Sequence, residues 1–153
     1  MIKKILLIFV LIFIYGCNGY NPIYSQKNQG FKIENIYFQG DIKLGKEIGR
    51  NINNIEKQNL NAVKKLDLYI QTKLEKSIKS KDTRGNPNKF QIKIVVDLNT
   101  KIDDEKSLEK RFSYSNIYNA LSSEFEQNKF EKTLEKTLVS KISEKIIIYL
   151  QTI

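Results

Sequence analysis

The chain has 153 residues, a formal net charge of +9 at pH 7, one cysteine and no histidine. Without histidine it lacks the commonest general base and metal ligand, and with one cysteine it forms no internal disulfide, Cys/His zinc site or Cys/His nucleophile pair. Only carboxylate, lysine, tyrosine or serine chemistry would remain for an enzyme, so we predict a non-enzymatic protein with no catalytic residues, metal site or cofactor. The length suits one ordinary domain.

The N-terminal segment has the three parts of a secretory signal. Two lysines at positions 3 and 4 are followed by the unbroken apolar run Ile5–Ile14 and by the small residue Gly16. The run is too short for a permanent transmembrane helix, which takes about 20 residues to cross the hydrocarbon. We therefore predict that residues 1–16 are a signal peptide.

Ile14-Tyr15-Gly16-Cys17 resembles the lipobox of bacterial lipoproteins, in which an aliphatic, a variable and a small residue precede an invariant cysteine. In those proteins the thiol receives a diacylglycerol, the chain is cut before it, and the new amino group is acylated. The resemblance implies lipidation of Cys17, and two or more acyl chains anchor a protein stably to a membrane. Cleavage removes two lysines and no acidic residue, which lowers the formal charge to +7. The alternative is a simple secretory signal with an incidental cysteine.

The next segments predict a tether, a strand and a helix. Residues 17–30 are polar and turn-rich, as expected of a lipidated tether, and Phe31–Phe38 is apolar and aromatic enough for a first strand. From Leu44 to about Lys57, isoleucines at positions 48, 52 and 55 recur at helical spacing. Glycines at positions 45 and 49 weaken this helix, because each costs about 1 kcal/mol against alanine.

Two further segments, Leu66–Glu75 and Phe90–Asn99, alternate apolar and polar residues. This pattern predicts strands of a sheet with one buried and one polar face. Asp82–Asn88 between them is a connection of turn residues. A fourth strand follows, in which Lys110 falls on the apolar side near the start, where its long stem can reach water. Loops this short cannot form crossovers, so the three strands should form an antiparallel meander.

The C-terminal segment predicts a long helix from near Ala120 to the end of the chain. Its apolar residues recur at a four-residue step, which is typical of a helix that covers a sheet. The predicted stripe comprises Leu121, Phe125, Phe130, Leu134, Leu138, Ile142, Ile146 and Leu150.

Together these elements predict a single α+β domain over residues 31–153, in the order β-α-β-β-β-α. The shared apolar face of the strands needs a cover, and the two helices supply it. We therefore expect a two-layer sandwich: a mainly antiparallel four-stranded sheet covered on one face by two helices, with its other face polar.

The order of elements and two segments resemble the LPS-assembly lipoprotein family, LptE. Cys17–Tyr24, with the sequence CNGYNPIY, resembles the family's lipidated cysteine followed by Gly, an aromatic residue and a Pro-apolar-Tyr. The second segment resembles the family's aromatic-containing last strand and the start of its final helix; it comprises Phe112–Ser115, Tyr118, Ala120, Leu121, Ser122 and Glu126.

The resemblance implies a non-enzymatic role. Family members sit as a plug inside the large outer-membrane β-barrel LptD, support its assembly, and help lipopolysaccharide reach the outer leaflet. A plug should have polar outer surfaces because the lumen of a large barrel is polar. Asn18 rather than aspartate follows the cysteine, which by the family's rule favours the outer membrane. Export makes nucleic acid an unlikely partner for the positive charge.

Lipopolysaccharide carries phosphates, which the positive charge would attract. From charge and strand face alone we expect such contacts to involve Lys73, Arg84, Lys93, Lys110 and Arg111. The alternative is that these side chains form an ordinary solvated face. Tyr114 and Tyr118 are better explained as packing residues than as ligands, and Asp103 and Asp104 as a turn than as a metal or acid–base site.

Two other functions stay open. The chain could be a periplasm-facing lipoprotein adaptor that binds lipid or a transport complex without entering a barrel, which would require an exposed apolar groove. It could also be a hydrolytic lipoprotein, but no base stands near Ser122 and Ser123. A serine there is better explained as a cap of the last helix.

Overall fold

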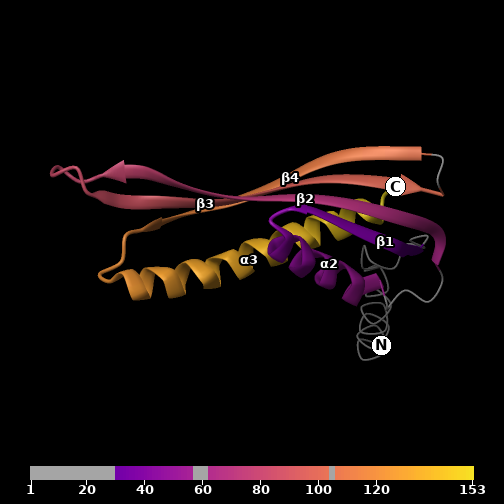
Figure 1. Ribbon diagram of the computed structural model, residues 1–153, viewed down its shortest axis with the longest axis horizontal. Helices are drawn as coiled ribbons and strands as arrows, with labels where there is room; N and C mark the ends of the chain where they lie inside the picture. The colour runs from indigo at the N-terminus through magenta and orange to yellow at the C-terminus, as the bar shows by residue number, and fades with distance from the viewer. Residues whose placement is uncertain (1–29, 57–61, 104–105) are drawn as a thin grey trace, which may run out of the picture.

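The computed structural model describes residues 30–56, 62–103 and 106–153. The predictions for the signal peptide, for Cys17 and for nearly all of the tether lie outside the described residues. The elements follow in the predicted order β-α-β-β-β-α, and the predicted α+β fold is confirmed (Figure 1). They are β1 (Gly30–Gly40), α2 (Ile42–Glu56), β2 (Ala62–Lys81), β3 (Pro87–Ile102), β4 (Lys106–Asn119) and α3 (Glu124–Leu150).

The four strands form one sheet in the order β1-β2-β3-β4. The meander is antiparallel as predicted, whereas β1 runs parallel to β2, with α2 as the crossover that a parallel pair needs. β1 shows a register shift between Ile33 and Asn35, where its alternation of apolar residues breaks. This irregularity keeps Ile33 and Ile36 packed against the core.

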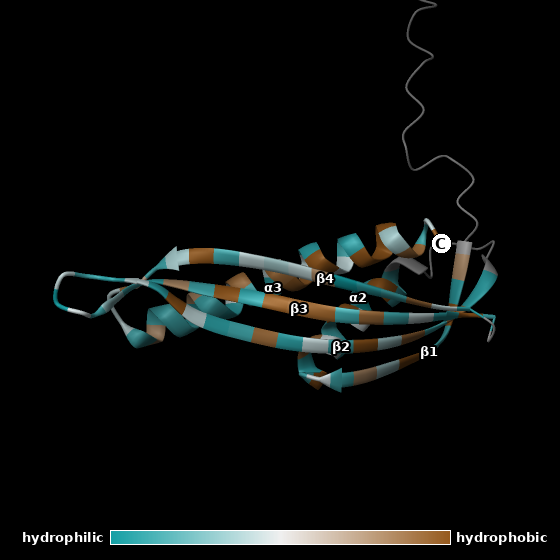
Figure 2. Ribbon diagram, turned by 90° about the horizontal axis from the view of Figure 1, so that it is seen from above, coloured by the Kyte–Doolittle hydropathy of each residue, from teal (hydrophilic) through white to brown (hydrophobic). Residues whose placement is uncertain are grey.

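The β2–β3 hairpin is much longer than β1. β2 has 20 residues, but β1 pairs with it only as far as Thr72. Among the described residues no strand pairs with the outer edge of β2 beyond that point, and Figure 2 shows the hairpin reaching far past the end of β1. The sheet therefore has a wide half, with four strands, and a narrow half, with three.

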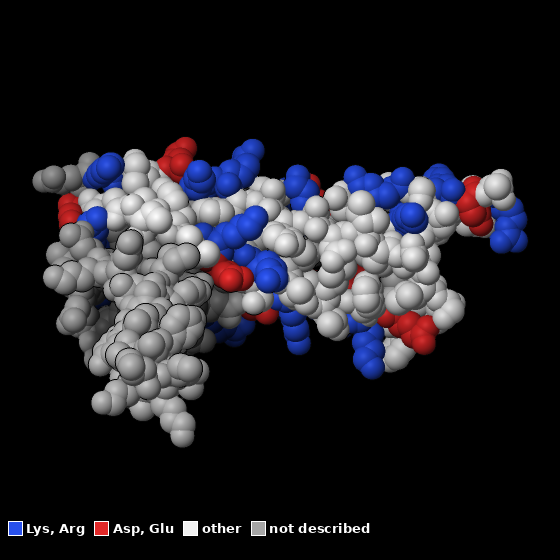
Figure 3. Space-filling view, turned by 180° about the vertical axis from the view of Figure 1, so that it is seen from behind, with Lys and Arg blue, Asp and Glu red and all other residues white. Residues whose placement is uncertain are grey.

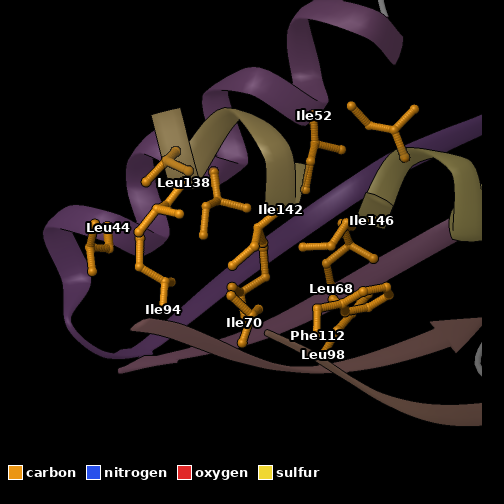
Figure 4. Close-up of a cluster of buried hydrophobic side chains, with 14 of the residues drawn as sticks. Leu44, Ile52, Leu68, Ile70, Ile94, Leu98, Phe112, Leu138, Ile142 and Ile146 are labelled. Atoms are coloured by element: carbon orange, nitrogen blue, oxygen red, sulfur yellow. The ribbon is translucent and has the colours of Figure 1, made fainter. Parts of the chain in front are cut away.

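Both helices lie on one face of the sheet, and the core fills the space between them in the wide half. Leu68, Ile70 and Leu98 of the strands are at most 1% exposed, as are Ile52 of α2 and Ile142 of α3 (Figure 4). Burying a side chain of this size stabilises a fold by about 1.5–3 kcal/mol. The core thus supplies the stability that the chain cannot obtain from disulfides.

The two glycines of α2 face β1. A Cβ atom at Gly45 would lie 3.0 Å from Phe38 Cδ1, and one at Gly49 would lie 2.8 Å from Phe38 Cζ. The glycines cost helix propensity, as the sequence indicated, but they allow the helix to approach the Phe38 ring closely. The helix begins after Asp41, whose Oδ1 accepts a hydrogen bond from the Leu44 amide at 3.1 Å.

The predicted start of the last helix near Ala120 is wrong by four residues. The Ala120 amide donates to the Asn88 carbonyl at 2.9 Å and so extends the strand pairing, and Ser123 caps the helix by accepting from the Glu126 amide at 3.2 Å. The expected serine cap is thereby confirmed, at Ser123. No helix in the described part of the chain is both long and apolar enough to span a bilayer.

The predicted apolar stripe of this helix is buried only from Leu134 onward. Leu121 lies before the helix and is 41% exposed, while Phe125 is 77% and Phe130 is 42% exposed. Figure 1 shows the reason, since α3 is inclined to the sheet and its N-terminal end lies farther from the strands. The first turns of α3 also lie beside the narrow half of the sheet, where β1 and α2 do not reach.

Candidate binding surface on the open face of the sheet

The face of the sheet opposite the helices, here called the open face, carries the polar members of each alternating strand. Asp67, Tyr69, Gln71, Lys73 and Glu75 of β2 point to this face because side chains alternate with a period of two. Figure 3 shows many Lys and Arg side chains along the upper margin of the molecule, where this face is seen from its edge. The predicted polar face is therefore present and accessible.

The structure brings three of the five predicted phosphate-binding residues to this face. Lys73, Lys93 and Arg111 lie on it, from three neighbouring strands. Lys110 is paired with the core residue Leu98 and so lies on the helix side, exposed as its predicted snorkelling position requires. Arg84 lies at the tip of the hairpin, where its Nε is 3.7 Å from an oxygen of Asp82. These five residues do not form one patch.

Two of the open-face lysines share one carboxylate. Lys73 Nζ lies 2.9 Å and Lys93 Nζ lies 3.6 Å from the carboxylate oxygens of Glu75. The hydrogen bond and charge of Lys73 hold the pKa of Glu75 below its usual value, with a smaller contribution from Lys93. The cluster keeps one positive charge in excess, which remains available to an anion because exposed ion pairs are weak.

Arg111 is neutralised by a neighbour on the next strand. Its Nε and Nη2 donate to the two oxygens of Asp97 at 2.5 Å and 3.0 Å, the bidentate geometry of a strong guanidinium–carboxylate pair. This hydrogen bonding lowers the pKa of Asp97 and raises that of Arg111. Arg111 therefore offers a phosphate less free charge than the sequence suggested.

A hollow of about 830 Å³ lies in the wide half of the open face. Two rows of paired side chains border it, and we call it the open-face trough. One row is Tyr37, Tyr69, Asn99 and Glu109, and the other is Gln39, Gln71, Asp97 and Arg111. Residue periodicity did not predict this trough, although the two tyrosines on the open face were a signal of it in the sequence.

A second polar group lies on the helix side of the narrow half. Tyr118 donates its hydroxyl proton to Glu131, and Lys76 Nζ lies 2.6 Å from the same carboxylate oxygen. Burial and this hydrogen bond raise the pKa of Tyr118. Burial alone would raise the pKa of Glu131, but the hydrogen bonds from Lys76 and Tyr118 outweigh it and lower that pKa.

The Tyr118 group takes part in the packing between β4 and α3. The Tyr118 ring is buried and stacks on Phe90 at 5.7 Å between centroids, which confirms the predicted packing role. Tyr114 is half-buried against the core, with Lys145 Nζ 4.9 Å from its ring centroid. Asp103 forms the predicted turn with φ of 47°, whereas Asp104 lies outside the described residues.

Within residues 30–56, 62–103 and 106–153, no three His, Cys, Asp or Glu side chains come together to hold a metal ion. The sequence suggested no base near Ser122, but the structure places the Glu126 carboxylate beside its hydroxyl. Ser122 donates to Glu126 at 2.7 Å on an exposed helix end.

The sequence matches no protein-family model and no curated protein. Solved structures of bacterial lipoproteins share the fold. Rare lipoprotein B from Shewanella oneidensis superimposes with a TM-score of 0.62 at 15% identity, over 77% of this chain and 94% of its own. A minor lipoprotein from Acinetobacter baumannii gives 0.63 at 8% identity, over 80% and 92%.

Lipoprotein B from Nitrosomonas europaea gives a TM-score of 0.60 at 17% identity, over 84% of this chain and 88% of its own. At these identities the likeness concerns the fold. The chain thus has the α+β fold found in bacterial lipoproteins of the lipoprotein B type.

Proposed function

We propose that this chain is a non-enzymatic outer-membrane lipoprotein, anchored through Cys17, that plugs an LptD-like β-barrel. In this role it supports assembly of the barrel and assists insertion of lipopolysaccharide into the outer leaflet. The observation that carries the proposal is the fold shared with bacterial lipoproteins over 77–84% of the chain. The sequence resemblance to the LptE family supports this specific role.

The shape and surface of the domain support this proposal. At about 3.3 Å per residue the 20 residues of β2 extend roughly 65 Å, more than the hydrocarbon thickness of a bilayer, so the domain is long enough to lie along a barrel axis. The open face carries polar and charged side chains, which suit the polar lumen of a large barrel.

The first test of the proposal is whether a β-barrel protein co-purifies with the chain. A tagged, lipidated chain extracted from its own outer membranes in mild detergent should bring down one large β-barrel protein in a near one-to-one ratio. A plug should retain this partner at high salt, because an enclosed interface is screened little by ions. Recovery of the chain alone, or with an inner-membrane transporter, would contradict the proposal.

Photo-crosslinking separates a plug from a protein docked by one face. A crosslinking residue is placed at Ser113 on the open face, at Lys46 on α2 or at Lys136 on α3, which are all exposed. A plug is surrounded, so all three positions should crosslink to the barrel. The buried position Leu138 serves as the negative control. Crosslinks from one face only would contradict enclosure.

Phosphate contacts form a separate part of the proposal. We expect replacement of Lys73, Arg84, Lys93, Lys110 and Arg111 by alanine to weaken binding of lipopolysaccharide. Because Lys73 and Lys93 surround one carboxylate, the double variant K73A/K93A should account for most of the loss from the open face. Wild-type affinity in the fivefold variant would rule out these contacts.

A second candidate is the periplasm-facing adaptor, and exposed apolar side chains in the narrow half favour it. Ile78 is 49%, Ile117 is 54% and Phe125 is 77% exposed. Such side chains suit a lipid or an apolar protein surface. The adaptor predicts crosslinks from this end of the molecule and none to a barrel from Lys46 or Lys136.

A further inference from the structure

The open-face trough contains an aromatic pair on an otherwise polar surface. Tyr37 of β1 and Tyr69 of β2 are direct partners in the parallel register, and their rings stack with centroids 4.6 Å apart and an interplanar angle of 18°. Tyr69 covers one face of the Tyr37 ring, yet Tyr37 remains 47% exposed. The sheet thus presents apolar ring surface where its neighbours are amides and charged groups.

The two rows that border the trough are matched residue by residue. In the first row Tyr69 is followed by Asn99, whose Nδ2 donates to Glu109 at 3.2 Å. The second row carries the two amides Gln39 and Gln71 and then the Asp97–Arg111 pair. The rows are two residues apart on each strand, or about 6.6 Å, so the trough is narrow.

The charges in the trough cancel. Arg111 is paired with Asp97, and Glu109 accepts a hydrogen bond from Asn99. Lys101 Nζ lies 5.3 Å from the Tyr69 ring centroid, so the formal charges of Asp97, Glu109, Arg111 and Lys101 sum to zero. An anionic ligand would find no excess of positive charge here, in contrast to the Lys73–Glu75–Lys93 cluster farther along the face. The ligand that fits is therefore uncharged.

The hydrogen-bonding groups further restrict the ligand. Amides both donate and accept, the guanidinium has donors left over, and tyrosine hydroxyls do either. A ligand rich in hydroxyl groups, each of which donates and accepts, matches such a border. It must also offer an apolar side to the tyrosine rings, since rings gain most from burying their surface. Sugars combine hydroxyl groups at their rim with apolar C–H faces.

We propose that the open-face trough binds a neutral oligosaccharide. Its C–H side packs against Tyr37 and Tyr69, and its hydroxyl groups bond to Gln39, Gln71 and Asn99. The volume of about 830 Å³ lies within the range of about 300–1,000 Å³ that small-ligand sites occupy. The same chemistry occurs in the sugar core of lipopolysaccharide and in the glycan strands of peptidoglycan.

Calorimetric titration of the lipidated protein in mild detergent tests this inference and separates the two sources. The probes are chitohexaose, maltohexaose and a dephosphorylated core oligosaccharide prepared from lipopolysaccharide. We expect one of them to bind with a Kd of about 1 mM or tighter. Tightest binding of chitohexaose would indicate a peptidoglycan-like ligand, and tightest binding of the core oligosaccharide would indicate lipopolysaccharide. Absence of binding by all three would overturn the inference.

Substitutions in the open-face trough test whether the oligosaccharide binds there. Y37A should weaken it about tenfold, whereas Y37F should stay within about twofold of wild type because the ring surface is retained. Q71A should weaken it severalfold through the lost amide. The matched control S113A alters the same face outside the trough and should leave the Kd unchanged. Equal binding by Y37A, Q71A and wild type would overturn the inference, whatever the barrel pull-down shows, since sugar binding does not depend on a barrel partner.

Discussion

The wide and narrow halves of the sheet have the same alternating pattern of residues but different degrees of burial. In the wide half Leu66, Leu68 and Ile70 of β2 are at most 1% exposed. In the narrow half Leu74 and Ile78, which continue the same face of the same strand, are 38% and 49% exposed. An apolar stripe thus becomes core only where other elements cover it, here β1, α2 and the C-terminal part of α3.

The two halves also differ in the contacts that hold their side chains in place. The wide half is held by close packing, with the Phe38 ring against the glycines of α2. The narrow half is held by the polar and aromatic contacts around Tyr118 and Glu131. The variants below test whether stability follows this division, beginning with the largest expected effect.

Truncation in the wide half should cost most. Ile142 is fully buried between α3 and the sheet, so I142A should lower the free energy of unfolding by about 2–5 kcal/mol. Urea denaturation followed by circular dichroism measures this loss. The matched control is I148A on the same helix, where the side chain is 48% exposed and the loss should stay below about 1 kcal/mol. Equal losses would contradict the assigned core.

Replacing a glycine of α2 by alanine tests the close approach of this helix to β1. In an exposed helix Gly→Ala stabilises by about 1 kcal/mol, but G49A places a Cβ atom 2.8 Å from Phe38 Cζ. We expect a net loss of about 1–2 kcal/mol from overpacking. Replacing Phe38 by the smaller leucine in the double variant G49A/F38L should restore part of the lost unfolding free energy. Strictly additive losses in the two single variants would show that the contact between Gly49 and Phe38 is not the cause.

The Tyr118 hydroxyl provides a test in the narrow half. Y118F keeps the stacked ring but removes the hydrogen bond to Glu131, which should cost about 1–2 kcal/mol of unfolding free energy. Hydrogen exchange should show the loss concentrated in the first turns of α3. Loosening spread evenly over both halves would contradict a local role for this bond.

The pH dependence of stability gives a further test of the same group. The pKa of Glu131 is lowered in the folded state, so its contribution is present above the ordinary glutamate value of 4.5 and is lost as the pH falls through the folded pKa. E131Q should therefore destabilise the protein at pH 7 and make a smaller difference at pH 3. A penalty that is the same at both pH values would exclude this ionic contribution.

The smallest effect is expected at the exposed end of the hairpin. I78S replaces a half-exposed apolar side chain and should change the free energy of unfolding by no more than about 0.5 kcal/mol. The same variant should weaken binding of an adaptor-type partner that docks on this end, as measured by crosslinking from position 125, which lies on the helix side of the sheet as Ile78 does. A large loss of stability would show that the narrow half is covered in solution.

The sequence by itself determined the element order, the open polar face, the exposed position of Lys110 and the serine cap. These features follow from residue periodicity and from local hydrogen bonding, which act within a few neighbours along the chain. Periodicity alone did not reveal how much of each apolar stripe is covered. Leu121, Phe125 and Phe130 continue the helical pattern, yet Leu121 lies before the helix and the inclination of α3 leaves Phe125 and Phe130 exposed.

Only the tertiary structure decided which distant residues meet. The parallel register of β1 and β2 brings Tyr37 beside Tyr69, and the register of β3 and β4 pairs Asp97 with Arg111 and so neutralises an expected phosphate ligand. Pairing across strands joins residues that are far apart in the chain, and a shift of one residue would move every side chain to the other face. The open-face trough therefore depends on strand register, which the pattern of a single strand does not encode.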